Sequence, residues 1–250
     1  MIGIALMAVL MCVNFTSCSE DDDPTEVKND NGIVISGKKL AIMAYENQDE
    51  SVIYKFTYDG EGKLATATKI VDDFHSKYDD RTDYYRFKWR SNNNVEIIGE
   101  DQEWDLNLTN GLIKYAENGY GDCYDFNYDK SNRFINATYE NRKEFKASWN
   151  GDKLMSVEFV DEYIDEFTYG KTCKNGYFPL FGELIDFDYS ILFMAHPELV
   201  GMRSKQLPVS ITSTEHIGDV YTKNIEYEFD KEGYISKIQI GSTKCTLTWE

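Results

Sequence analysis

The sequence has few of the residue types that build metal centres and disulfide frameworks. It contains three histidines, five cysteines and four prolines in 250 residues. The histidines, His75, His196 and His216, lie far apart without metal-ligand spacing. No zinc-protease, phosphate-binding-loop or nucleophile-elbow motif occurs. We therefore expect no metal and no cofactor, and the sequence carries no motif for catalysis.

Positive charge is also scarce. Lysine and arginine number 26 against 44 aspartates and glutamates, for a formal net charge of −18. Such a surface repels the phosphates of nucleic acids and anionic lipid head groups. We therefore exclude nucleic acid as a partner. With so many acidic residues, chance clusters of carboxylates are expected and do not by themselves indicate a metal or glycosidase site.

The N-terminus contains the only long apolar run, from Met1 to Val13, which is shorter than the ~20 residues needed to span a bilayer. A small residue, Ser17, precedes Cys18, and an acidic tract follows it. This arrangement looks like a bacterial lipoprotein signal, cut before Cys18, which then carries lipid. Two departures are Phe15, where leucine is usual, and the lack of Lys or Arg before the run. An ordinary secretory signal is the alternative.

The acidic tract resembles the surface-export signal of Bacteroidota lipoproteins, which implies an outer-membrane protein exposed at the cell surface. We divide the chain into a signal peptide (1–17), a lipidated cysteine with an acidic tether (18–32) and one β domain (33–250). The tether is too polar to bury a core. The expected partner at this end of the chain is the membrane, through the lipid on Cys18.

Three cysteines remain in the domain, which is not a disulfide framework. Whether Cys123 and Cys173 pair is left open. Cys245 alternates with Leu247 and Trp249 in the last predicted strand, so these three side chains should be buried. The intervening polar side chains should face water: Lys244, Thr246 and Thr248.

Hairpins dominate the domain. Strands with alternating aromatic residues run into Asn-Gly or Asp-rich turns, as in residues 124–132, and then into a second alternating strand, as in residues 54–68, 87–98 and 227–240. This is the strongest short-range hairpin signal. Six degenerate copies predict an all-β fold, an antiparallel meander of about 12–14 strands. That number is more than an open twisted sheet usually carries, so we expect a barrel-like or strongly curled sheet.

One segment breaks the pattern. Residues 179–195 are apolar with helical spacing, Pro179 is suited to start a helix, and Pro197 would end it. Acidic residues interrupt the segment, so it is not a membrane span. We expect one helix packed across a barrel end or against the open side of the sheet.

The chain resembles a known family at these features. The lipoprotein start, the hairpin turns at residues 58–64 and 229–235, the apolar helix and the following residues 204–208 look like a family of uncharacterised Bacteroidota lipoproteins. The resemblance implies a porin-like fold. The hairpins also look like the YD repeats of large secreted shell-forming proteins. Neither likeness brings catalytic residues.

The aromatic residues suggest a function, because sugars stack on flat rings with one wet edge. Several rings lie near ends of predicted elements: Tyr84, Tyr85, Trp104, Tyr120, Tyr177 and Phe178. We interpret the protein as a non-enzymatic binding or envelope-assembly module whose ligand is a glycan or an amphiphile. The ligand would enter a barrel mouth opposite or beside the helix, lined by Tyr177, Phe178 and Phe181. A secreted-side glycan hydrolase is the alternative, and a transmembrane β-barrel is a third reading.

Overall fold

A computed structural model of the protein describes residues 37–76, 80–100, 103–139, 142–160, 162–182, 190–215 and 218–250. The predicted signal peptide, Cys18 and the tether lie outside the described residues, as does His216. The predicted domain boundaries therefore stay predictions.

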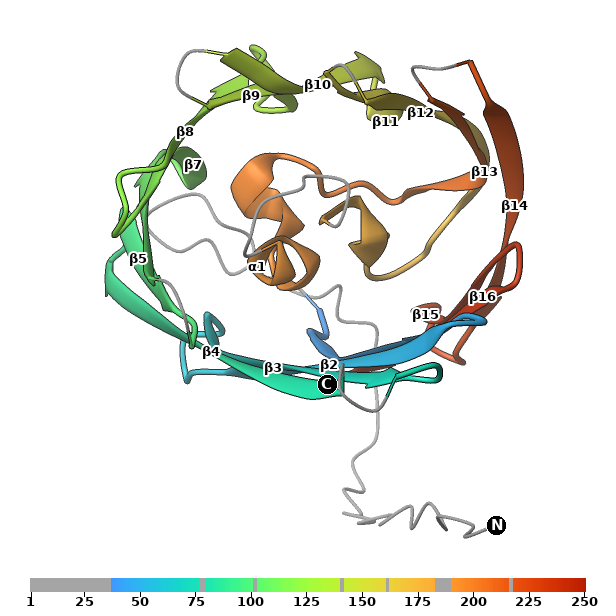
Figure 1. Ribbon diagram of the computed structural model, residues 1–250, viewed down its shortest axis with the longest axis horizontal. Helices are drawn as coiled ribbons and strands as arrows, with labels where there is room; N and C mark the ends of the chain where they lie inside the picture. Colours follow the sequence, from blue (N-terminus) through green and yellow to red (C-terminus); the bar gives the residue numbers. More distant parts are fainter. Residues whose placement is uncertain are drawn as a thin grey trace, which may run out of the picture.

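The described chain forms a closed antiparallel barrel in which each strand pairs with the next and β16 pairs with β1 (Figure 1). The all-β class, the meander and the barrel are confirmed. The strands are β1 Leu40–Glu46, β2 Glu50–Tyr58, β3 Leu64–Asp73, β4 Arg81–Ser91, β5 Asn94–Ile98, β6 Glu103–Thr109, β7 Leu112–Asn118, β8 Cys123–Tyr128, β9 Phe134–Tyr139, β10 Arg142–Asn150, β11 Lys153–Phe159, β12 Tyr163–Thr172, β13 Gln206–Glu215, β14 Val220–Phe229, β15 Ile235–Ile240 and β16 Thr243–Trp249.

The predicted strand count of 12–14 was too low, since the barrel has sixteen strands. The hairpin pattern did not reveal β1, β12 and β13. β1 pairs with β16 from the other end of the chain, and β12 and β13 are joined by a long connection. Local turn signals carry no information about such pairings.

One turn geometry recurs in the hairpins. Asp59 Oδ1 accepts hydrogen bonds from the backbone N–H groups of Glu61 and Lys63, both at 2.9 Å. Asp129 and Asp230 make the same two bonds in the turns after β8 and β14. Each turn has a residue with positive φ in the same place, such as Gly62 at 85°. The repeat visible in the sequence is therefore a repeated Asp-capped turn.

Seven of the eight even-numbered strands share a second feature near their ends. The last inward-facing aromatic side chain of an even-numbered strand donates its O–H or N–H to a carbonyl near the start of an odd-numbered strand. Seven such bonds are described: Tyr58 to Leu40, Trp89 to Leu64, Tyr128 to Ile113, Trp149 to Phe134, Tyr169 to Leu154, Tyr227 to Pro208 and Trp249 to Ile235. These bonds satisfy the polar tips of buried rings.

The predicted packed helix is confirmed, but in the described residues it is shorter than 179–195. The structure has a 3-10 helix η1 at Pro179–Gly182, a short helix α1 at Ile191–Ala195 and a second 3-10 helix η2 at Pro197–Val200. Pro179 begins η1. Pro197 begins η2, two positions after α1 ends at Ala195. The apolar periodicity is satisfied by packing inside the barrel ring (Figure 1), where Phe193 and Phe181 meet the inward rings of Phe126 and Phe167. No helix in the described ranges is long and apolar enough to cross a membrane.

The last strand has the predicted alternation. Cys245, Leu247 and Trp249 are 3%, 7% and 8% exposed, while the side chains between them face water. Cys123, Cys173 and Cys245 are free thiols. Cys123 begins β8 and Cys173 follows the end of β12, which places them at opposite ends of the barrel, so they do not pair.

The outer wall of the barrel is polar. Cross-strand pairs on it include Lys146–Glu158 at 2.6 Å, Lys237–Glu228 at 2.8 Å and hydroxyl ladders such as Thr212–Thr222. The inner wall carries the apolar core. A lipid-embedded barrel has the opposite alternation, apolar outside and polar inside. The wall described here therefore has the chemistry of a barrel that stands in water, which argues against the transmembrane reading.

Candidate functional site

The two ends of the barrel differ, and antiparallel order assigns every turn to one of them. At one end the even-numbered strands end, and residues 173–205 join β12 to β13. We call this end the plugged end. This connection is fastened to the turns there, for example by Tyr128 Oη to the carbonyl of Leu199 and Ser204 Oγ to the carbonyl of Asp152. We call the other end, where odd-numbered strands end, the distal end.

A buried polar pair, His196 and Glu198, fixes the end of α1 to the barrel wall. His196 is the C-cap of α1, and its Nε2 accepts the backbone N–H of Leu64 at 3.1 Å. Nδ1 therefore carries the proton and donates to Glu198 Oε1 at 2.8 Å. Burial alone would raise the pKa of Glu198, but His196 and Arg203 hold it below its usual range. The pair is a structural clamp between the end of α1 and the barrel wall.

The distal end of the inner wall holds a tyrosine cluster made of Trp104, Tyr124, Tyr139, Asn118 and Asp122. The ring centroids of Tyr124 lie 5.9 Å from Trp104 and 5.1 Å from Tyr139. Tyr139 Oη donates to Asp122 Oδ1, and Asn118 Nδ2 donates to Asp122 Oδ2, both at 2.7 Å. These two bonds lower the pKa of the Asp122 carboxyl. Both tyrosines are only half-buried.

A second polar group lies on the inner wall, on β12 and β13, which are separated from β9 by β10 and β11. Asp165 on β12 is 7% exposed and accepts a hydrogen bond of 2.5 Å from Ser213 on β13. Burial raises the pKa of Asp165. Tyr163, one inward position nearer the distal end, stacks on Phe159 with 4.3 Å between ring centroids.

The rings and polar groups of the distal inner wall have the chemistry that sugar-binding sites use. Flat rings with polar edges offer stacking faces, while carboxylate, amide and hydroxyl groups accept and donate hydrogen bonds to sugar hydroxyls. Among the described residues no group of histidine, cysteine or acidic side chains has the arrangement of a metal site. The distal inner wall thus places stacking faces beside hydrogen-bonding groups.

The structure places the sequence-predicted residues apart from this cluster. Tyr177, Phe178 and Phe181 are 5%, 1% and 0% exposed and lie in the core at the plugged end. Tyr177 donates to the carbonyls of Met194 and Ala195. Their contact with a ligand stays a prediction, but the distal inner wall is formed by other residues.

Of the other rings named from the sequence, only Trp104 belongs to the tyrosine cluster. Tyr84 is 59% exposed on the outer wall, and Tyr120 is 76% exposed in the turn before β8. Alternation alone assigns Tyr124 and Tyr139 to the barrel core. Their position in the strands is the signal that separates them from core residues. Each is the inward residue nearest a distal turn, and such a residue has core on one side only.

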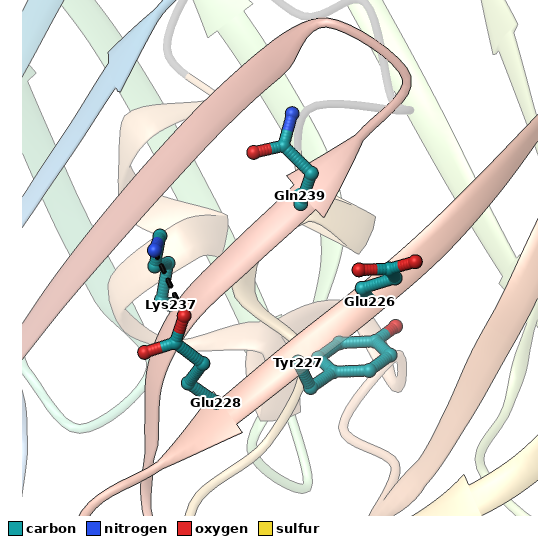
Figure 2. Close-up of a pocket in the computed structure, with 5 residues that line it drawn as sticks. All are labelled: Glu226, Tyr227, Glu228, Lys237 and Gln239. Atoms are coloured by element: carbon teal, nitrogen blue, oxygen red, sulfur yellow. Dashed lines mark hydrogen bonds and ion pairs between the residues drawn. The ribbon is translucent and has the colours of Figure 1, made fainter.

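A shallow depression on the outer wall is a weaker candidate (Figure 2). It measures about 140 Å³ and is lined by Glu226, Tyr227, Glu228, Lys237 and Gln239 of β14 and β15. Glu228 is held by Lys237, and Tyr227 Oη is bonded to the carbonyl of Pro208. Ligand pockets usually measure about 300–1,000 Å³ and are mostly apolar. This depression has the character of a solvated wall.

Comparison with known proteins supports the fold. No family model and no curated protein matches the chain. A crystal structure of a porin-like protein from Bacteroides uniformis is similar with a TM-score of 0.67 at 12% identity, covering 85% of this chain and 97% of that one. The resemblance to porin-like Bacteroidota proteins is thus confirmed, and at this identity it concerns the fold alone.

A second porin-like structure, from Bacteroides vulgatus, also has 12% identity and covers 89% of this chain and 92% of that one. Its TM-score is 0.29, which is too low to carry an argument.

Proposed function

We propose that the protein is a lipid-anchored, non-enzymatic binding protein of the outer membrane, exposed at the cell surface, that holds a glycan at the distal end of its barrel. The observation that carries the proposal is the tyrosine cluster: half-buried inward rings next to a carboxylate and an amide, on a barrel with a polar exterior. An amphiphile is the alternative ligand, since the same inner wall is apolar farther in.

The charge at the distal end narrows the ligand class. Glu46, Asp49, Glu50 and Asp122 lie in or beside its turns, and the pKa of Asp122 is lowered, so its carboxyl is ionised at neutral pH. An anionic polysaccharide would meet repulsion there. We therefore infer that the glycan is neutral or carries amino groups.

The anchor is tested by metabolic labelling with a fatty-acid analogue in a bacterium that processes lipoproteins. The intact protein should take up label and fractionate with membranes. The Cys18→Ala variant should lose both properties. Label that persists in the variant would overturn the assignment of Cys18.

Glycan binding is tested by screening the protein on an array of neutral, amino-bearing and acidic glycans, followed by calorimetry. We expect the Tyr124→Ala, Tyr139→Ala double variant to bind about ten- to a hundredfold more weakly, because two rings contribute about 1–3 kcal/mol together. Tyr84→Ala removes an exposed outward ring and serves as the matched control, with unchanged affinity. Equal affinity of the double variant, or binding of lipids only, would refute glycan binding at the cluster.

Hydrolysis is the second candidate, favoured by one observation. Asp165 is the described carboxyl whose pKa is raised by burial, as a general acid requires. A glycosidase needs a second carboxyl on the other side of the scissile bond. The test is an assay of reducing sugar released from a bound glycan. Release by the protein that is lost in the Asp165→Asn variant would show hydrolysis and replace the binding function.

A further inference from the structure

The β13–β14 hairpin extends past its neighbours at the distal end. Residues 220–224 of β14 pair with β13, whereas β15 pairs with β14 only from Ile225 onward, toward the plugged end. A backbone bond from the N–H of Gly241 to the carbonyl of Asn224 closes the pairing on the β15 side. β14 lies between β13 and β15 in the ring (Figure 1), so this part of the hairpin stands above the rim beside it. Its inner face therefore overlooks the mouth of the barrel.

Two side chains on that inner face are open to solvent. Tyr221 and Lys223 flank the outward residue Thr222, so they share a face with Ile225, which is 3% exposed in the core. Tyr221 is nevertheless 50% exposed, and Lys223 is exposed as well. An inward side chain is exposed only where no other part of the protein covers it. On this side the mouth of the barrel is therefore open as far as Lys223 and closed at Ile225.

A buried carboxylate lies in the same cross-strand row. Asp165 on β12 pairs with Ser213 on β13, and Ser213 pairs with Tyr221 on β14. Asp165 is 7% exposed, and its Oδ1 accepts a hydrogen bond from the hydroxyl of Ser213. Its Oδ2 has no hydrogen-bond partner in the described residues, yet this oxygen is not sealed from solvent. Asp165 thus keeps one acceptor oxygen for a group that enters from the mouth.

Lys223 supplies the opposite charge one row deeper, where it pairs with Ile211 on β13. Burial raises the pKa of Asp165, and the Ser213 hydroxyl and the charge of Lys223 oppose part of that rise, so the ammonium lies near the carboxyl. The carbon stem of Lys223 lies beside Gly241. Its ammonium makes no ion pair with a described residue. The ammonium is therefore available to donate hydrogen bonds to a ligand.

Aromatic rings line the inner wall between these groups and the tyrosine cluster. The ring centroids of Phe145 on β10 and Phe159 on β11 are 5.0 Å apart, and Phe159 stacks on Tyr163 of β12 at 4.3 Å. Tyr139 on β9 and Asp165 on β12 are three strand spacings apart, about 14 Å along the wall. That span is longer than one sugar ring. A ligand that contacts both Tyr139 and Asp165 must therefore be a chain of sugars.

The groups on the hairpin match the hydroxyls of a neutral sugar. Each sugar hydroxyl both donates and accepts, so adjacent hydroxyls can donate to Asp165 Oδ2 and accept from the ammonium of Lys223. The exposed ring of Tyr221 offers a stacking face beside them. An amino group on the ligand would meet the like charge of Lys223, and an acidic group would meet Asp165. The chemistry therefore favours an uncharged sugar.

We propose that Asp165, Ser213, Tyr221 and Lys223, which we call the hairpin subsite, bind a neutral sugar through its hydroxyl groups. The ligand of the barrel is then a neutral oligosaccharide. One part of the chain stacks in the tyrosine cluster, and another part reaches the hairpin subsite. This proposal rests on the glycan binding of the proposed function, and it narrows the ligand from neutral or amino-bearing glycans to neutral chains.

The test is calorimetry of the full-length protein with series of sugars of increasing length. The neutral probes are linear oligomers of glucose, mannose, galactose and xylose, from disaccharide to hexasaccharide, and the amino-bearing probes are chitosan oligomers. The hairpin variant is Tyr221→Ala, Lys223→Gln. Its matched control is Tyr84→Ala, Lys55→Gln, which removes an exposed tyrosine and an exposed lysine from the outer wall. Thermal melts check that all variants are folded.

We expect affinity within a neutral series to rise with chain length until both subsites are filled. The hairpin variant should bind the hexasaccharide about ten- to a hundredfold more weakly, because a stacking face and a charged hydrogen bond are lost. It should bind the disaccharide as the parent does, and the control should bind both normally. Lys223→Gln alone should improve the binding of chitosan oligomers relative to neutral ones, which a purely structural lysine would not do.

The two proposals fail in different ways. Neutral glycan that binds with the same affinity at every length, or that loses equal affinity in the hairpin variant and the control, refutes the hairpin subsite and keeps glycan binding at the tyrosine cluster. An equal loss for disaccharide and hexasaccharide in the hairpin variant refutes a chain that spans both subsites. Absence of binding to every series contradicts glycan binding itself.

Discussion

The plugged and distal ends are built from the same strands, yet they use aromatic side chains differently. At the plugged end, rings such as Trp89, Trp149 and Trp249 donate to backbone carbonyls of a neighbouring strand. At the distal end, Tyr139 bonds Asp122 and Tyr45 bonds Glu50 through side chains. The first arrangement holds a barrel closed. The second leaves groups that can exchange partners with a ligand.

The largest expected effect is at the plugged end. Trp249→Ala should lower the free energy of unfolding by about 3–5 kcal/mol, because the ring is buried against Tyr177 and Tyr234 and its N–H is bonded. Tyr139→Ala, at the distal end, should cost less because its ring is half-buried. Urea denaturation of both variants checks the order. A larger loss for Tyr139→Ala would contradict the division between the ends.

A glycine substitution sharpens the same comparison. Gly201 follows η2 with φ of 61°, and a Cβ there would lie 2.2 Å from the carbonyl oxygen of Asn132. Gly201→Ala should cost about 2 kcal/mol or more, from backbone strain and this clash. Gly119→Ala in a distal turn meets nothing within 4 Å and should stay within about 0.5 kcal/mol. Thermal melts of the two variants separate these outcomes, and equal melting temperatures would show that the plug is not tightly seated.

The sequence predicts these features unequally. Hairpins such as β8–β9 follow from local alternation and the Asp129 turn, and so does the burial of Cys245, Leu247 and Trp249. Closure of β1 on β16 joins residues more than 200 positions apart, and no local pattern encodes it. The 179–195 segment has helical periodicity, but packing inside the ring breaks it into short helices.

The candidate site was predicted less well than the fold. Alternation shows that Tyr124 and Tyr139 point inward. Whether an inward ring is core or binding surface depends on which end the 173–205 connection fills, and that is a tertiary property.

The smallest expected effect concerns acid. The hydroxyl of Tyr139 and the amide of Asn118 lower the pKa of Asp122 in the folded protein below the unfolded value of about 3.9. This contribution is present above that pH and is lost as pH falls through the folded pKa. Tyr139→Phe should therefore be less stable than the parent at neutral pH, with the gap narrowing below about pH 4. A gap that is constant with pH, in urea midpoints, would contradict the Tyr139–Asp122 bond.

The most direct test of the division between the ends is amide hydrogen exchange of the protein with and without a bound glycan. We predict that the glycan slows exchange at 118–124 and in the distal halves of β9 and β12. The plugged-end turns at 59–63, 129–133 and 230–234 should exchange at an unchanged rate. Slower exchange in the plugged-end turns with none at the distal end would contradict the account.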